Sequence, residues 1–207
     1  MYKRQIVYNV VGIPSWREVH LKERFEERFG VPVHVNNDCN CFALGVCRFG
    51  EALGCRDVVC IARGTGVGAG IVIDGKLYSG PNTGAGEIGS IPYLDRDYEY
   101  YCSSRFFVGR GTSGKEAFER AAAGDPGALA LWREFGGHIG QLVMLALYAY
   151  DPEAIVFGGS ISQAFDFFRE AMYERLAEFP YARTVERLRI GCSKIENVGL
   201  LGASACE

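Results

Sequence analysis

The sequence has no block of like charges and no strong charge of one sign. Its 22 basic and 25 acidic residues give a net charge of −3 at pH 7, whereas nucleic-acid surfaces usually concentrate lysine and arginine. This composition therefore argues against a nucleic-acid surface. No signal peptide is apparent. The longest apolar helix candidate, Gly136–Tyr150, is too short to span a bilayer, and we interpret it as a buried helix.

The sequence also lacks C-x-x-C pairs. A structural zinc site needs four ligands, commonly two close pairs, and Cys39-x-Cys41 has neither a second pair nor a His-x-x-x-His to complete it. We therefore expect no metal there. The eight cysteines lie mostly in apolar segments, and we interpret them as reduced core thiols of a cytoplasmic protein. They are residues 39, 41, 47, 55, 60, 102, 192 and 206.

The residues that are present predict an α/β protein. The 207-residue chain is 48% hydrophobic and 13% aromatic, which is enough to bury a core in one domain or two small ones. Leu21, Phe25 and Phe29 recur every four residues before Gly30, which predicts an amphipathic helix with a glycine stop. A strand, a helix and a strand then follow with short joins, which favours a parallel βαβ unit. They cover residues 31–35, 40–48 and 57–62.

Antiparallel and helical structure is expected further along. Residues 71–73 and 76–78 flank Asp74-Gly75, a pair that favours the primed turn of a β-hairpin. A glycine-rich loop over 81–89 and an irregular aromatic segment over 91–101 follow. The rest is predicted to be largely helical, interrupted by one apolar strand. The helices cover 115–123, 128–150 and 162–178, and the strand covers 154–157.

Asp38 ends the stretch Asn36-Asn37-Asp38, after the first predicted strand and before a predicted helix. Open α/β sheets bind ligands at the carboxyl ends of their strands, but aspartate is also a preferred N-cap. Spacing alone leaves both interpretations open. The two asparagines favour a functional role slightly, because amides and a carboxylate together can bind several hydroxyls of a polyol.

Two glycine clusters can approach a ligand closely. In GTGVGAG (64–70), the glycines allow successive N–H groups to face an anion, and Thr65 adds a hydroxyl. It is neither a Walker loop, which needs a lysine, nor a dinucleotide fingerprint, which needs a following helix. The alternative is a glycine-rich bulge before the hairpin. GGS (158–160) follows a buried strand and suits a flat or phosphorylated ligand, with Ser160 free to cap the next helix.

Two further carboxylates are candidates for a site. Glu87 lies between Gly86 and Ile88 in a loop, where it either faces a ligand or is simply solvated. Glu99 lies among four tyrosines, where a lone surface charge is less expected; the alternative is the edge of an aromatic core.

Taken in order, these segments resemble the ROK family of bacterial sugar kinases and sugar-responsive repressors, which have the actin-like ATPase (ribonuclease H-like) fold. The resemblance runs from about Val11 to Ala205. It rests on six motifs in the family's order: FGxPVxVxND at 29–38, GTGxGxG at 64–70, GxLYxG at 75–80, GAGEIG at 84–89, ExYxS at 99–103 and DPExIVxGGxxS at 151–162.

The resemblance implies a role for each candidate residue. Asp38 becomes the general base that takes the proton from the sugar hydroxyl attacking ATP, and Asn37, Glu87 and Glu99 become ligands of other hydroxyls. One carboxylate suffices because, in phosphoryl transfer, the protein mainly positions reactants and stabilises charge. The implied ATP contacts are Gly64, Thr65, Gly66 and Gly68 for the phosphates and Gly158 and Gly159 for the nucleoside.

The sequence departs from the family at a zinc loop. Members commonly continue GEIG with a histidine and a CxCGxxGCxE loop, whose histidine and cysteines bind zinc. Here Ser90 stands at the histidine position, and IPYLDRDYEYYCS (91–103) keeps only the final Glu99. We therefore expect no zinc, and expect Ser90 to lose or remake the histidine's sugar contact. We also expect packing among the tyrosines of the segment to rigidify it: Tyr93, Tyr98, Tyr100 and Tyr101.

The family's DxGGT phosphate loop, whose aspartate helps to hold Mg²⁺, is expected upstream of Val11 and is absent from this sequence. We interpret residues 1–5 as a sequencing-adapter scar, because GTG TAT AAG AGA CAG, which encodes them with a GTG start, resembles the end of a transposase adapter. An ordinary basic N-terminus is the alternative. We expect residues 1–53 to be the remnant of a small domain and residues 54–207 to be a large domain with the ATP and sugar motifs.

The expected activity is ATP- and Mg²⁺-dependent phosphorylation of a glucose-like hexose or an N-acetylhexosamine. We expect little turnover from this chain, since half of the phosphate clamp is missing. The alternative is a sugar-responsive repressor of the same family whose helix-turn-helix has been lost; retention of Asp38 favours a kinase modestly. The resemblance also implies a homodimer, without a membrane partner and, for this chain, without nucleic acid.

Overall fold

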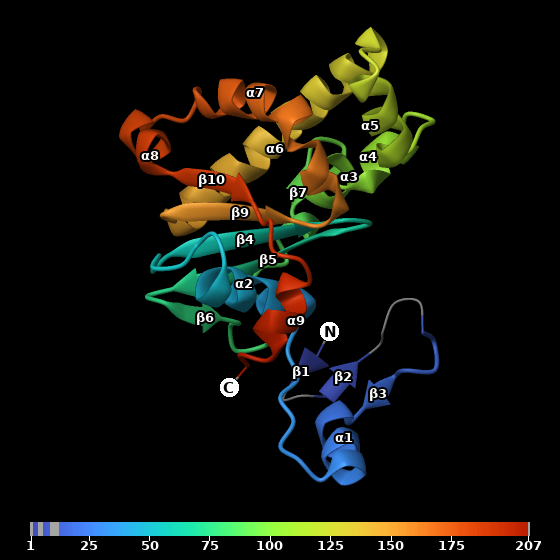
Figure 1. Ribbon diagram of the computed structural model, residues 1–207, viewed down its shortest axis with the longest axis vertical. Helices are drawn as coiled ribbons and strands as arrows, with labels where there is room; N and C mark the ends of the chain where they lie inside the picture. Colours follow the sequence, from blue (N-terminus) through green and yellow to red (C-terminus); the bar gives the residue numbers. More distant parts are fainter. Residues whose placement is uncertain (1, 4–5, 9–12, 207) are drawn as a thin grey trace.

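The computed structural model describes residues 2–3, 6–8 and 13–206. At its centre is a five-stranded mixed sheet in the order β10-β9-β4-β5-β6, with helices on both faces (Figure 1). Strand β4 is central: it runs parallel to β9 and antiparallel to β5, while β10 runs parallel to β9 and β6 antiparallel to β5. The strands are β4 (Val58–Arg63), β5 (Val67–Ile73), β6 (Lys76–Tyr78), β9 (Ala154–Gly158) and β10 (Arg189–Cys192).

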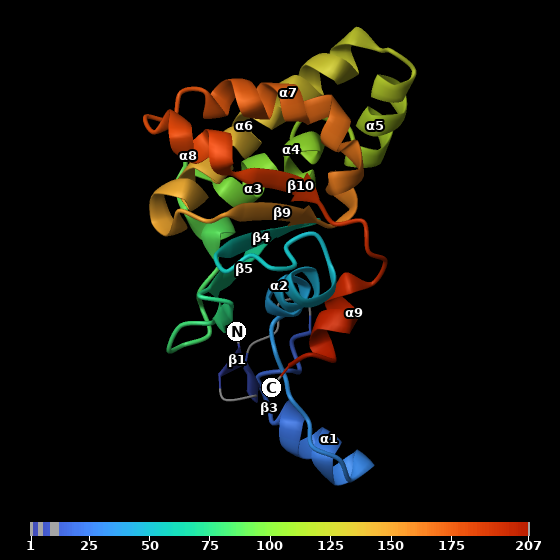
Figure 2. The ribbon, with the colours of Figure 1, turned by 60° about the vertical axis from the view of Figure 1, so that its left-hand side comes forward.

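Successive strand residues face opposite sides of the sheet, as the two-residue period of a strand requires. Ile61 and Phe157 join one apolar core with helices α3–α7, and Cys60 and Val156 join another with α2 and α9. The two helical layers lie on either side of the sheet (Figure 2). The helices are α2 (Asp38–Phe49), α3 (Tyr98–Cys102), α4 (Ser104–Val108), α5 (Gly114–Ala122), α6 (Pro126–Tyr150), α7 (Phe165–Leu176), α8 (Ala182–Arg187) and α9 (Val198–Ala203).

Helix α6 confirms the prediction of a long buried helix. Its N-cap Asp125 accepts a hydrogen bond from the N–H of Ala128 at 2.8 Å, and Pro126 occupies the first turn, where its missing N–H is not needed. Trp132 and Phe135 are almost fully buried on its inner face. Of the helices in the described part of the chain, none combines the length and apolar character required to cross a membrane.

The segment before α2 differs from the prediction. Residues 31–35 are not assigned to a strand in the described part of the chain, so the predicted parallel βαβ unit is wrong at its first strand. The N–H of Val33 donates to the carboxylate of Glu26 at 3.0 Å instead of to a strand. The strands nearest in sequence form a separate antiparallel sheet: β1 (Tyr2–Lys3), β2 (Ile6–Tyr8) and β3 (Glu18–Val19).

Helix α1 (Leu21–Phe29) has the predicted bounds and ends at Gly30, whose φ of 67° is left-handed. Its apolar stripe is not buried, however: Phe25 is 42% exposed and Phe29 64% exposed. The interpretation of residues 1–5 as an adapter scar and the start of the ROK resemblance at Val11 fall largely outside the described residues.

The predicted hairpin is confirmed. Asp74 and Gly75 have φ values of 53° and 74°, the primed geometry that a two-residue hairpin turn needs, and Ile73 pairs with Lys76. The aromatic segment is more regular than predicted. It forms a small hairpin of β7 (Pro92–Tyr93) and β8 (Arg96–Asp97) that leads into α3.

Helices α2 and α9 cross where each carries a glycine. A Cβ added at Gly202 would lie 1.7 Å from the carbonyl oxygen of Cys41, and one added at Gly45 would lie 2.1 Å from that of Val198. The contact ties α2, which precedes the expected domain boundary after residue 53, to the last helix. That boundary stays a prediction.

Gly202→Ala is therefore expected to lower the free energy of unfolding by about 2–3 kcal/mol, because backbone atoms can escape the new methyl group only if the helices separate. Denaturant unfolding measures the change. Gly199→Ala, in the same helix, is the matched control: apart from its own helix backbone, no heavy atom of the described residues lies within 4 Å of its added Cβ, and alanine favours a helix. Equal effects of the two substitutions would contradict the close crossing.

Candidate active site

The N-terminus of α2 presents Asp38 to solvent. Asn37 is the N-cap: its Oδ1 accepts hydrogen bonds from the N–H groups of Cys39 at 2.8 Å and Asn40 at 3.4 Å. Asp38 is the first helical residue, and its Oδ1 accepts from the N–H of Cys39 at 2.9 Å. The alternative in which Asp38 caps the helix is therefore wrong. The Asp38 carboxylate is exposed at the positive end of the helix dipole.

Asn40, which was not predicted as a site residue, fixes the chain that leads to Asp38. Its side chain is buried, and its Nδ2 donates to Asn36 Oδ1 at 2.9 Å and to Ser79 Oγ at 3.4 Å. The available signal was a polar residue among the apolar residues of the helix. Asn40 thereby joins the Asn36–Asp38 corner to the segment that follows β6.

Residues 64–66 form the loop of the β4–β5 hairpin. The loop is closed by the Arg63–Val67 pair and by a hydrogen bond from the N–H of Gly64 to the carbonyl oxygen of Gly66 at 3.1 Å. Residues 67–70 are already strand, so the glycine-rich stretch is itself part of a hairpin and not a bulge before one. Thr65 is exposed in this loop.

Glycines of β5 allow α2 to lie directly against the hairpin. A Cβ added at Gly68 would lie 2.7 Å from the sulfur of Cys39, and one added at Gly70 would lie 2.4 Å from the carbonyl oxygen of Cys39. Larger residues would push the helix away. The two glycines therefore bring Asp38 next to the 64–66 loop.

The loop that carries Glu87 is hydrogen-bonded to β5 and packs closely against it. The carbonyl of Gly86 accepts from the N–H of Ala69 at 2.8 Å, and a Cβ at Gly89 would lie 2.2 Å from the carbonyl oxygen of Val67.

Burial, the charge and hydrogen bond of Asp38 and the charge of Glu87 raise the pKa of the Cys39 thiol to about 12. Glu87 is exposed, and its charge and that of Asp38 both act on this thiol. Ser90 is exposed at the end of the short helix η1 (Ile88–Ser90).

Glu99 approaches the 64–66 loop from the other side. Its Oε2 accepts from the N–H of Val67 at 3.3 Å, and its Oε1 pairs with Arg105 Nη2 at 2.9 Å. Arg105 was not singled out in the sequence analysis. The aromatic packing expected around Glu99 is present: the rings of Tyr93 and Tyr98 stack with centroids 4.3 Å apart, and Tyr93 also contacts Tyr101 edge-on at 5.4 Å.

The second glycine cluster meets the first at Arg63. Gly159 has a φ of 87°, and a Cβ there would lie 1.9 Å from the carbonyl oxygen of Arg63. A Cβ at Gly158 would lie 2.4 Å from the ring of Phe42 on α2. The prediction that Ser160 caps the next helix is wrong. Ser160 begins the short helix η2 (Ser160–Ala164), whose cap Gly159 has no side chain to contribute.

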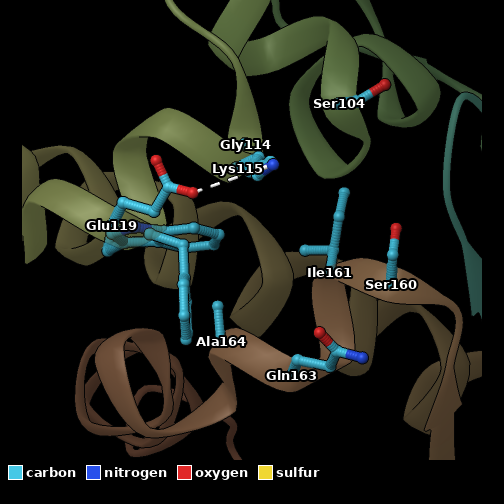
Figure 3. Close-up of a pocket in the computed structure, with 10 residues that line it drawn as sticks. Ser104, Gly114, Lys115, Glu119, Ser160, Ile161, Gln163 and Ala164 are labelled. Atoms are coloured by element: carbon cyan, nitrogen blue, oxygen red, sulfur yellow. Dashed lines mark ion pairs between the residues drawn. The ribbon is translucent and has the colours of Figure 1, made fainter. Parts of the chain in front are cut away.

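A cavity of about 470 Å³ opens beside Ser160, between η2 and the helices α4, α5 and α6 (Figure 3). Its size falls within the range of small-molecule sites. Its walls are largely apolar, with an ion pair between Lys115 and Glu119 at 3.9 Å on one side. The helical lining residues could not be predicted from the sequence, because no motif marks them: Ser104, Gly114, Lys115, Phe118, Glu119, Trp132, Ile161, Gln163 and Ala164.

The structure thus brings the predicted residues together around the carboxyl ends of β4 and β9. Asp38, Asn37 and Glu87 lie on one side of the β4–β5 hairpin, and Glu99 lies at its loop. Gly158 and Gly159 join the hairpin to the cavity. In the described part of the chain, no three His, Cys, Asp or Glu side chains gather closely enough to hold a metal ion. The absence of zinc stays a prediction.

Comparison with known proteins identifies the family. The ROK family profile matches residues 2–206. The glucokinase of Streptomyces coelicolor is 33% identical over 198 residues, covering 79% of this chain and 62% of that protein. The xylose repressor of Bacillus subtilis is 24% identical over 209 residues, covering 92% of this chain and 54% of the repressor. The chain therefore spans less than two thirds of the length of these relatives.

Solved structures agree in fold. A putative sugar kinase from Cytophaga hutchinsonii superposes with a TM-score of 0.87 at 28% identity, covering 98% of this chain and 74% of that one. The ROK glucokinase from Streptomyces griseus, in complex with glucose and AMPPNP, gives a TM-score of 0.77 at 29% identity, covering 92% and 72%. The chain belongs to the ROK family, and its α/β fold is the actin-like ATPase fold of the family's sugar kinases.

Proposed function

We propose that this site belongs to an ATP-dependent kinase that phosphorylates a glucose-like hexose or an N-acetylhexosamine. The observation that supports it best is the position of the exposed Asp38 carboxylate against a glycine hairpin that leads, through Gly159, to a nucleoside-sized cavity. The Streptomyces griseus glucokinase, in complex with glucose and AMPPNP, is a relative with the two kinds of ligand that this arrangement suits.

On the sugar side, Asp38 acts as the general base. It accepts the proton of the attacking hydroxyl, a contribution of about 10²–10⁴ in rate for a well-placed base. Because Asn37 uses its Oδ1 as the helix cap, it offers its Nδ2 to a sugar hydroxyl. Glu87 and Ser90 bind further hydroxyls from the η1 side. Glu99, fixed by Val67 and Arg105, accepts from a hydroxyl with its remaining lone pairs.

On the nucleotide side, the 64–66 loop with Thr65 and the following Gly68 faces the phosphates, and Gly158 and Gly159 lead to the nucleoside. The apolar cavity beside Ser160 takes the base. Mg²⁺ bound with the nucleotide would neutralise phosphate charge. The protein's part is to align the γ-phosphate with the hydroxyl that Asp38 deprotonates and to exclude water from the pair.

Three finer points belong to this proposal. Residues 1–53 and 54–207 are parts of the small and large domains, the protein acts as a cytoplasmic homodimer, and turnover by this chain is slow because it contains no DxGGT sequence. Mg²⁺ would then be held mainly by a segment that carries DxGGT.

Transfer of labelled γ-phosphate from ATP to a sugar tests the proposal. Glucose, N-acetylglucosamine, N-acetylmannosamine and fructose are offered to the chain and to a version preceded by a DxGGT-containing small-domain segment. We expect sugar-dependent transfer that is slow in the chain and faster in the extended version. If neither transfers label to any of the four sugars although both bind one, the kinase proposal fails.

That outcome would favour the second candidate, a sugar-sensing repressor, which the similarity to the Bacillus subtilis xylose repressor supports. A repressor binds the sugar and transfers no phosphate. Calorimetric titration with sugar, alone and with a nucleotide, separates the two: a kinase binds both ligands, and a sensor binds the sugar alone.

A further inference from the structure

Arg63, the last residue of β4, carries a charge without a partner. The residue is 1% exposed. Its Nε, Nη1 and Nη2 atoms are buried and make no hydrogen bond within the described part of the chain. Buried charges are normally paired or hydrogen-bonded, because an ion that leaves water loses its hydration. An unpaired guanidinium in the core therefore requires an explanation.

Aromatic rings surround this guanidinium. Its Cζ lies 4.3 Å from the ring centroid of Phe157, 5.0 Å from that of Phe168 and 5.9 Å from that of Phe135. The faces of aromatic rings attract cations and replace part of the lost hydration. They carry no net charge, so the positive charge of Arg63 is not neutralised by this cage.

Two buried thiols near Arg63 do not neutralise it either. Burial raises the pKa of Cys102 and of Cys192, even though the charge of Arg63 acts in the opposite direction, so both thiols are uncharged at neutral pH. Burial lowers the pKa of Arg63 to about 10, which still leaves the guanidinium protonated at neutral pH. The end of β4 thus holds one positive charge that no described residue neutralises.

The charge of Arg63 lies next to the loop proposed to bind the phosphates. Arg63 directly precedes the 64–66 loop, and Gly159 packs on its carbonyl, so both glycine turns of the site meet at this residue. The same region presents the carboxylates of Asp38, Glu87 and Glu99, which repel a polyphosphate. Arg105 pairs with one of them, Glu99.

We propose that the buried charge of Arg63 strengthens the binding of the nucleotide's phosphates at the 64–66 loop, acting through the protein interior without touching the ligand. This inference rests on the proposed function. A charge inside a low-dielectric interior is screened much less than one at the surface, and a fixed positive potential favours anions in the adjoining turn. The same charge makes the ligand-free protein less stable than one with an apolar residue at this position.

Arg63→Met tests the proposal, because methionine fills similar space without charge, and Arg63→Lys is the comparison variant that keeps a basic side chain. Titration calorimetry gives the dissociation constants of a non-hydrolysable ATP analogue and of adenosine. We expect Arg63→Met to weaken binding of the analogue about tenfold, with adenosine binding unchanged. Arg63→Lys keeps most of the preference for the analogue. We also expect thermal unfolding of ligand-free Arg63→Met at a higher temperature than wild type.

The outcomes separate this inference from the proposed function. If Arg63→Met weakens the binding of adenosine and of the analogue equally, or weakens the binding of neither, Arg63 has only a structural role. The inference is then overturned while the kinase proposal stands. If the wild-type chain binds neither ligand, the nucleotide site itself is wrong, and both fail. Should Arg63→Met not fold, Arg63→Leu is titrated in its place, and misfolding of both neutral variants, with Arg63→Lys folded, overturns the inference in favour of a structural charge.

Discussion

Asp38→Asn is expected to lower the rate of phosphoryl transfer to the sugar by a factor of about 10²–10⁴. Asparagine has nearly the same shape, and its Oδ1 can still accept from the N–H of Cys39, as Asp38 does at 2.9 Å. Asn37 caps the helix in either variant, so the local fold is retained. The substitution removes the proton acceptor and leaves the binding groups in place. The loss should therefore appear in kcat, with the dissociation constants of sugar and nucleotide nearly unchanged.

Labelled-phosphate transfer gives the rate, and calorimetry gives the two dissociation constants. Asp74→Asn is the matched control. Asp74 is an exposed aspartate in the β5–β6 turn, at the end of β5 remote from Val67, and its φ of 53° suits asparagine equally well. Its substitution should leave turnover unchanged. Near-normal turnover of Asp38→Asn would show that another group takes the proton.

Local signals carried the sequence predictions that succeeded. Asp74-Gly75 fixed a hairpin because both residues tolerate positive φ, and Gly30 ended α1 for the same reason. The apolar pattern predicted a long helix over 128–150, and the structure begins it two residues earlier, at Pro126 after the N-cap Asp125. In each case the residues that decide the structure lie within a few positions of one another.

Non-local contacts explain the failures. Residues 31–35 have a strand-like pattern, but a strand needs a partner, and no local pattern supplies one. Strand β10 and helix α9 were not predicted. The six-residue α9 has no side-chain cap, and its position depends on the close crossing with α2, which is 150 residues away in sequence. Phe25 and Phe29 show the converse: their spacing predicted the helix α1 correctly but could not show what its apolar stripe packs against.

In the candidate site too, local motifs were predicted correctly and non-local contacts were not. The motifs singled out Asp38, Glu87 and Glu99, and the structure places them around one hairpin. The possible N-cap was placed one residue too late, at Asp38 and not at Asn37. Asparagine and aspartate both cap helices, and only the extended backbone of Asn37 identifies it as the cap. The cavity lining was not predictable, because Lys115, Trp132 and Ile161 come from three separate helices that meet only in the folded chain.

The cavity yields the second large prediction: Ser160→Trp should weaken nucleotide binding by about 100-fold or more, which corresponds to roughly 2.7 kcal/mol or more. Ser160 is exposed at the start of η2 and lines the cavity (Figure 3), so an indole there occupies the space proposed for the base without disturbing the core. Most of the proposed sugar groups lie away from this cavity, at the start of α2 and around η1, while Glu99 of α3 is held at the 64–66 loop by Val67 and Arg105. Glucose binding should therefore be unchanged, and calorimetric titration of each variant with the ATP analogue and with glucose measures both.

Ser160→Ala is the matched control, because it removes the hydroxyl and fills no space. If the alanine variant loses as much nucleotide affinity as the tryptophan variant, the hydroxyl itself binds the ligand and the steric argument fails. If a folded Ser160→Trp binds the analogue as wild type does, the nucleoside lies outside this cavity. Loss of glucose and nucleotide affinity together would mean that η2 also supports the sugar side. The expected loss, confined to the nucleotide, requires that the cavity and the Asp38 corner be two separate halves of one site, joined through the glycine turns that meet at Arg63.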